Sequence, residues 1–168
     1  MNNAVPIFFS HTNDDRRWCE LLATDAEQIG VTAYLAEHDP HAGTPLADKV
    51  KTNITKAKAV VVFLTNNSEG SAYVHQEVGY ALARGKLVIP VVQPGLPSGT
   101  LAMLQGLEYI EFDFEDPGPA RESLVMQLGR IAERQQKQGE IEALMAVGLC
   151  LAIVALLLHE GASVSSPI

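Results

Sequence analysis

The chain has 168 residues, of which 47% are hydrophobic and 19% are charged, so it is long enough for one globular domain with a segment left over. The formal net charge is −8 and no stretch concentrates lysine and arginine, which argues against a nucleic-acid-binding protein. The two cysteines, Cys19 and Cys150, are far apart in the sequence, so they indicate neither a disulfide framework nor a metal site and fit a reducing compartment.

Five short apolar runs along the chain are typical of buried β-strands. They cover Val5–Phe9, Val31–Ala36, Ala59–Leu64, Leu87–Val92 and Leu107–Phe112. Between them lie patterns that predict helices over about Asp14–Ile29, Leu46–Lys56, Ser71–Arg84 and Ala120–Gln138. This alternation predicts an α/β fold with a five-stranded parallel sheet flanked by helices. In such folds the functional sites lie beyond the carboxyl ends of the strands.

The helix expected after Ser71 carries the most informative pair of side chains. Ser71 is a favoured N-cap residue, and Gly85 supplies the glycine at which a helix commonly ends. Tyr73 and Glu77 are four residues apart and therefore lie on the same helix face. An aromatic ring beside a carboxylate can hold a flat cationic ring and stabilise developing positive charge, as in glycosidic bond cleavage. On this stretch alone, a solvated surface glutamate is the commoner interpretation.

Other chemistries find little support in the sequence. Neither a Gly-x-Gly-x-x-Gly fingerprint nor a Walker-type loop follows any expected strand. The histidines near the strand ends lack the spacing of metal ligands, so we expect no metal site; they are His11, His38, His41 and His75. Ser10 precedes His11 directly, but adjacent side chains rarely point at each other, and no Gly-x-Ser-x-Gly elbow supports a serine nucleophile.

Three segments, in this order and spacing, resemble motifs of Toll/interleukin-1 receptor (TIR) domains. Phe8–His11 is similar to the opening box of the family, and Asp39–Gly43 is similar to its BB loop. Ser71-x-Tyr73-x-x-x-Glu77 resembles the Ser-x-Trp-x-x-x-Glu motif of enzymatic members, with tyrosine in place of tryptophan. The resemblance extends over residues 4–137 and implies a flavodoxin-like arrangement of the sheet.

The resemblance to enzymatic TIR domains implies that the protein cleaves NAD⁺. It assigns the catalytic role to Glu77 and substrate binding to Tyr73, Phe9, Ser10, Asp39 and Gly43. NAD⁺ is then the substrate, no further cofactor is expected, and the product is ADP-ribose or a cyclic ADP-ribose-type signal. The resemblance further implies a role in bacterial antiphage defence, with self-association and a downstream effector as partners.

Two alternatives to this enzyme remain open at the level of sequence. Many TIR domains are adapters, so the chain can be a non-catalytic signalling module that acts by protein–protein assembly. A nucleoside deoxyribosyltransferase-like enzyme shares a related α/β layout and also uses a glutamate. Nicotinamide release separates the adapter from the enzyme, and a comparison of nucleosides with NAD⁺ separates the two enzymes.

The last part of the chain differs in composition from the rest. Ile141–Leu158 holds a single charge, Glu142, and spans about 27 Å as a helix against a hydrocarbon core of about 30 Å. We therefore expect a TIR domain over 1–138, one transmembrane helix over 139–160 and a short tail over 161–168. The alternatives are a buried core helix and a terminal helix that packs in a soluble oligomer.

The charges that flank this segment predict its orientation. Arg121, Arg130, Arg134 and Lys137 precede the apolar run, and neither lysine nor arginine follows it. The positive-inside rule then places the TIR domain in the cytoplasm. Gly148 and Ala152 form a small-x-x-x-small pair, which favours close approach of two such helices and hence self-association.

Overall fold

A computed structural model describes residues 4–36, 48–68, 70–97, 99, 104 and 106–163, with side chains described up to residue 155. Its centre is a single five-stranded parallel sheet, with strand order β2-β1-β3-β4-β5. The strands are β1 (Val5–Ser10), β2 (Val31–Leu35), β3 (Ala59–Leu64), β4 (Leu87–Val92) and β5 (Ile110–Glu111). The prediction of a five-stranded parallel sheet is confirmed.

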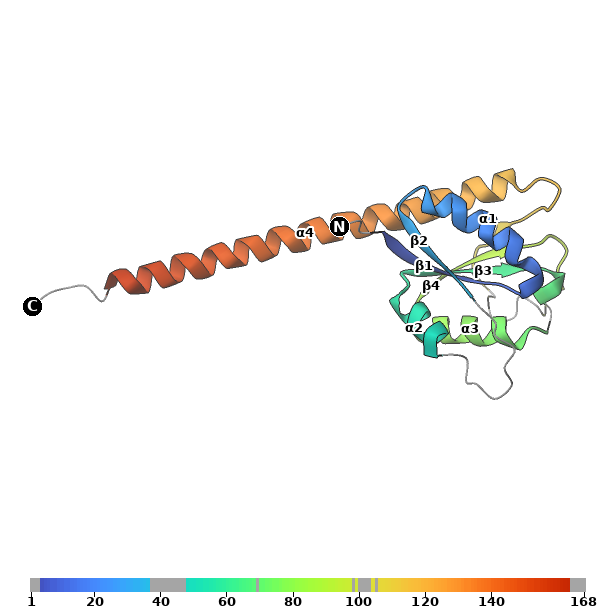
Figure 1. The fold of residues 1–168 in the computed structure, drawn as a ribbon, viewed down its shortest axis with the longest axis horizontal. Coiled ribbons are helices and arrows are strands. Elements are labelled where there is room, and N and C mark those ends of the chain that lie inside the picture. The colour runs from blue at the N-terminus through green and yellow to red at the C-terminus, as the bar shows by residue number, and fades with distance from the viewer. Residues whose placement is uncertain are drawn as a thin grey trace, which may run out of the picture. The chain divides into compact units, whose positions relative to one another are not determined.

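Helices cover both faces of the sheet (Figure 1). They are α1 (Arg16–Glu27), α2 (Asp48–Lys56), α3 (Ala72–Ala83) and α4 (Gly118–Ser163), with short 3₁₀ turns η1 (Asn13–Asp15) and η2 (Asn66–Ser68) after β1 and β3. The start of α4 packs with α1 on one face, whereas α2 and α3 pack together on the other. The helices α1, α2 and α3 thus carry the chain over a face of the sheet between β1 and β2, β2 and β3, and β3 and β4, as parallel pairing requires.

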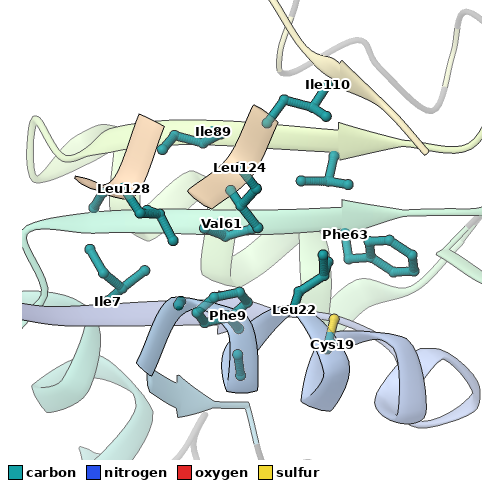
Figure 2. Close-up of a cluster of buried hydrophobic side chains, with 14 of the residues drawn as sticks. Ile7, Phe9, Cys19, Leu22, Val61, Phe63, Ile89, Ile110, Leu124 and Leu128 are labelled. Carbon is teal, nitrogen blue, oxygen red and sulfur yellow. The ribbon is translucent and has the colours of Figure 1, made fainter. Parts of the chain in front are cut away.

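Each face has its own hydrophobic core because successive side chains of a strand point to opposite sides. Phe9 and Val61 lie in the core beneath α1 and α4, together with Leu22 and Leu124 (Figure 2). Phe8, which neighbours Phe9, lies in the other core with side chains of α2 and α3. The central strand β3 is buried along its whole length, which explains why its sequence is apolar without alternation.

The fifth strand is shorter than its sequence predicts. The apolar run indicates Leu107–Phe112, but only Ile110 and Glu111 pair with β4, opposite its last two residues. Leu107 and Tyr109 are exposed, so no core holds the preceding residues in the sheet. At an edge of the sheet with one neighbour, apolar composition alone does not extend a strand.

The last helix is longer than its sequence predicts. Instead of ending near Gln138, α4 continues through Gly139 to Ser163. A single glycine inside a helix costs only about 1 kcal/mol relative to alanine, and neither proline nor a polar turn follows it. The polar helix and the apolar helix that the sequence predicts as two elements thus form one continuous helix.

The chain divides into two compact units, Met1–Ala132 and Glu133–Ile168. In the second unit all side chains of residues 141–155 are exposed, including those of Leu144 and Met145. The helix contains an 18-residue window with a mean hydropathy of 1.6, and none of that window is buried. By length and composition this helix is able to cross a membrane.

Candidate functional site

A buried carboxylate lies where the end of β1 meets α3. Glu77 is completely buried, and the hydroxyl of Ser10 donates a hydrogen bond of 2.6 Å to its Oε2 atom. Ser10 is the last residue of β1 and is itself buried. The two side chains are 67 positions apart in the sequence, so only the fold brings them together.

Local rules of strand and helix explain how this pair forms. Ser10 follows Phe8 by two residues, so it points to the same face of the sheet, towards α3. On the helix side, Ser71 caps α3 by accepting a hydrogen bond from the backbone N–H of Val74, as its sequence predicts. Glu77 then falls on the inner side of α3, as do Val74 and Val78, whose side chains are buried.

Burial changes the proton affinity of this carboxyl group. It raises the pKa of Glu77 from 4.5 to about 7, and the hydrogen bond from Ser10 lowers it in part. A carboxyl group is expensive to bury in its charged form, and carboxyl groups with strongly shifted pKa values are common at functional sites. Near neutral pH this group can therefore hold or release a proton, which suits general acid–base or electrostatic catalysis.

Tyr73 stands one turn before Glu77 on α3, but its environment differs. Its side chain is 45% exposed, whereas Glu77 is buried. An exposed aromatic ring one helical turn from a buried carboxylate can contact a ligand by stacking without any loss of core packing. On α3, Tyr73 is thus placed for contact with a ligand at the surface, whereas Glu77 is a buried acid.

A second buried carboxylate, that of Asp15, was not predicted from the sequence. Asp15, in η1, is 1% exposed and accepts hydrogen bonds from Thr12 (2.6 Å), Thr65 (2.7 Å) and Asn67 (2.8 Å). These bonds connect the loop after β1 with the loop after β3, next to Ser10. The pattern Thr12-x-x-Asp15, similar to a capping box, is the signal that was available in the sequence.

The other predicted site residues divide into two groups. The side chain of Phe9 is fully buried in the core beneath α1, among Ile7, Leu22 and Cys19 (Figure 2), which favours a packing role, and its expected role in substrate binding stays a prediction. Strand alternation turns Phe9 away from the face of Ser10 and Glu77. Asp39 and Gly43 lie outside the described residues.

The histidines do not form a ligand cluster within the described part of the chain. His11 is buried, and its Nδ1 atom donates a hydrogen bond of 2.7 Å to the backbone oxygen of Thr12. No group of three or more histidine, cysteine, aspartate or glutamate side chains there is arranged to hold a metal ion. The described side chains near Glu77 therefore offer acid–base and hydrogen-bonding chemistry.

Comparison with known families identifies the class of this fold and site. The model of the TIR domain family matches residues 7–125, a stretch that contains Ser10, Tyr73 and Glu77. The chain therefore belongs to the TIR domain family, and the resemblance of its motifs to that family is confirmed. No match is found among curated protein sequences.

Solved structures show the same fold at low sequence identity. The TIR domain of the Toll-related receptor TRR-2 from Hydra magnipapillata has a TM-score of 0.58 at 16% identity, over 76% of this chain and 99% of that one. The CMP N-glycosidase BcmB from Clostridium botulinum has a TM-score of 0.51 at 20% identity, over 70% and 98%. A flavodoxin-like domain from Synechococcus sp. has a TM-score of 0.52 at 15% identity, over 76% and 99%. A TIR domain of flavodoxin-like architecture is thus the fold.

Proposed function

We propose that this TIR domain cleaves the bond between nicotinamide and ribose in NAD⁺, with Glu77 as its catalytic carboxylate. The observation that carries the proposal is the completely buried Glu77, held by the Ser10 hydroxyl at the carboxyl end of β1. Further support comes from the exposed ring of Tyr73 one turn away and from the resemblance of the Ser71–Glu77 motif to enzymatic TIR domains.

The reaction follows from the chemistry of the substrate and of the site. The nicotinamide nitrogen carries a positive charge in NAD⁺, so it leaves as a neutral base with the bonding electron pair and needs no general acid. The ribose carbon then develops oxocarbenium character, which ionised Glu77 stabilises through the ribose hydroxyls or directly. The Ser10 hydroxyl holds the carboxylate in place, and Tyr73 stacks on a ring of the substrate.

The group that attacks the ribose carbon decides which product forms. Attack by water forms a carbon–oxygen bond, releases a proton and yields ADP-ribose. Attack by the adenine or by a ribose hydroxyl of the same molecule yields a cyclic product. NAD⁺ is consumed as the substrate, and the proposal needs no other cofactor.

A direct test uses the purified full chain in detergent micelles with NAD⁺. We expect release of nicotinamide, and we expect the Glu77→Gln variant to lose at least about 100-fold in rate, because glutamine accepts the Ser10 hydrogen bond but carries no charge. Mass spectrometry of the products distinguishes ADP-ribose from a cyclic isomer. Release that persists in Glu77→Gln contradicts the assignment of Glu77.

The same assay separates the two alternatives to this proposal. Base release from CMP or from deoxynucleosides, without release from NAD⁺, favours a nucleoside-processing enzyme of the deoxyribosyltransferase-like class. A folded chain that releases no base from any of these substrates favours a non-catalytic module that acts by assembly.

We also propose that residues 139–160 cross a membrane once, with the TIR domain in the cytoplasm and residues 161–168 on the other side. The support is the apolar, exposed helix of residues 141–155 and the basic residues that precede it. Fractionation of cells tests the anchor: we expect the chain in the membrane fraction, resistant to carbonate extraction. A chain that is wholly soluble without detergent contradicts it.

We propose that the chain self-associates through both the TIR domain and this helix, and that its signal serves bacterial antiphage defence through a downstream effector. Oxidation of Cys150 tests contact between the helices, because this residue lies on the exposed apolar helix between Gly148 and Ala152. The other cysteine, Cys19, is buried; burial raises the pKa of its thiol, and the negative charges of Asp15 and Glu20 raise it further. Mild oxidation in membranes is therefore expected to give a dimer that Cys150→Ser abolishes. Absence of cross-linking, or cross-linking that survives Cys150→Ser, contradicts contact between the helices at this position.

A further inference from the structure

We infer that Asp15 is a positioning residue: its carboxylate ties the loop after β1 to the loop after β3 and thereby holds the Ser10 hydroxyl against Glu77. This inference deepens the proposed function and rests on it for its effect on catalysis. Asp15 acts through Ser10 and Glu77, and its effect on Glu77 can be measured without substrate.

The contacts of Asp15 divide into one local bond and two bonds between the loops. Its Oδ2 atom accepts from Thr12, three residues earlier, and from Thr65, fifty residues later. Its Oδ1 atom accepts from the side-chain amide of Asn67. The carboxylate is 1% exposed, so these charge-assisted bonds replace the water that a surface aspartate would have. Of these three bonds, the ones to Thr65 and Asn67 connect different parts of the chain.

A continuous series of hydrogen bonds leads from Asp15 to the helix that carries Glu77. The backbone N–H of Thr65 donates to the Ser68 hydroxyl at 3.1 Å, and the N–H of Ser71 donates to the backbone oxygen of Ser68 at 3.1 Å. Ser71 is the N-cap of α3. Displacement of the loop after β3 therefore displaces the start of α3, on which Glu77 lies in the second turn.

Asp15 is also close to Ser10 along the chain. Asp15 ends η1, five residues after Ser10, and its backbone N–H donates to the oxygen of Thr12 at 3.1 Å. The loop from Ser10 to Asp15 is thus fixed internally, and Asp15 joins it to the loop that positions α3. The bond of 2.6 Å between Ser10 and Glu77 tolerates little relative movement of these two loops.

Two matched pairs of variants test this role in the full chain in detergent micelles. Thr65→Val and Asn67→Ala each remove one bond between the loops. Thr12→Val removes only the local bond, and Asn66→Ala changes an exposed neighbour for which the described residues show only a backbone hydrogen bond. Because Asn67 is also exposed, its truncation provides a test that does not depend on a buried substitution.

The first measurement is the titration of Glu77 by the ¹³C resonance of its carboxyl carbon, assigned by its loss in Glu77→Gln. The Ser10 bond lowers the pKa of Glu77, so weakening it in Thr65→Val and Asn67→Ala raises the titration midpoint by about half to one pH unit. The midpoints of Thr12→Val and Asn66→Ala are expected to equal that of the unmodified chain.

The second measurement is nicotinamide release from NAD⁺. A misplaced carboxylate lowers kcat by about 10-fold to 100-fold in Thr65→Val and Asn67→Ala, with KM changed by less than about 3-fold. The inference is overturned if both variants keep the midpoint and kcat of their controls, or if they lower only the melting temperature. The titration needs no turnover, so a chain that does not cleave NAD⁺ refutes the proposed function while the positioning role is still decided.

Discussion

At the scale of single residues, the site depends on one carboxyl group whose protonation changes near neutral pH. Glu77 combines complete burial with a hydrogen bond from Ser10, and these act on its pKa in opposite directions. Because burial is the larger effect, the folded protein holds the proton of Glu77 more tightly than the unfolded chain does. This difference predicts how the proposed activity and the stability of the fold depend on pH.

The pH dependence of activity should follow the ionisation of Glu77. The ionised form stabilises positive charge on ribose, so kcat/KM for NAD⁺ is expected to rise with pH and to level off above the pKa of about 7. Initial rates of nicotinamide release between pH 5 and pH 9 measure this profile. A flat profile, or one that falls as pH rises to 8, contradicts catalysis by the ionised carboxylate.

The same group should make the folded protein less stable as pH rises. Its pKa is raised on folding, so its favourable contribution is complete below the unfolded value of 4.5 and is lost as pH rises through about 7. The loss amounts to about 3 kcal/mol at about 1.4 kcal/mol per pH unit. Urea unfolding at pH 4.5 and pH 8 measures it, and the pH effect should shrink by this amount in Glu77→Gln, which cannot ionise.

Tyr73 is expected to affect substrate affinity without affecting the fold. Its side chain is 45% exposed, and loss of one stacked base is worth about 1–3 kcal/mol. Tyr73→Ala should therefore raise KM for NAD⁺ about 10-fold with an unchanged melting temperature, while Tyr73→Trp should keep KM or lower it. Tyr109→Ala, at another exposed tyrosine, is the matched control. Equal KM values for Tyr73→Ala and this control exclude stacking by Tyr73.

At the scale of elements, the sequence correctly predicts those bounds of strands and helices that local patterns determine. The bounds of β3 and β4 agree with prediction because both strands are apolar runs between polar turns. The short β5 and the continuous α4 do not, since pairing at a sheet edge and continuation through Gly139 are not decided by composition. Tyr73 and Glu77 could be found by helical spacing, whereas the contacts of Asp15 depend on long-range packing.

Strand alternation at the end of β1 gives a further prediction. Phe9 lies in the core and Ser10 faces Glu77, although both belong to the same motif. Phe9→Leu should therefore lower the free energy of unfolding by about 1 kcal/mol through imperfect repacking, with KM for NAD⁺ unchanged. Urea unfolding and initial rates measure the two quantities. A rise in KM with unchanged stability indicates instead that Phe9 contacts the substrate.

At the scale of the whole molecule, the TIR domain and the apolar helix are stabilised in different ways. The domain has a complete core on each face of its sheet, so its fold does not need the exposed residues 141–155. An exposed helix of this hydropathy is a liability in water but is stable in lipid, where its backbone groups are already paired. The proposed membrane anchor would also confine the domains to a surface and so raise their effective concentration.

Activity per molecule should therefore depend on surface density if self-association assembles the site. In liposomes at constant bulk protein concentration, we expect nicotinamide release per chain to rise as the protein-to-lipid ratio increases, because neighbouring domains then meet more often. The control is Val147→Arg, which places a charge worth about 2.5–3.5 kcal/mol in the middle of the apolar run and should release the chain from the membrane. A rate per chain that is independent of density, with Val147→Arg equally active, shows that each domain acts alone.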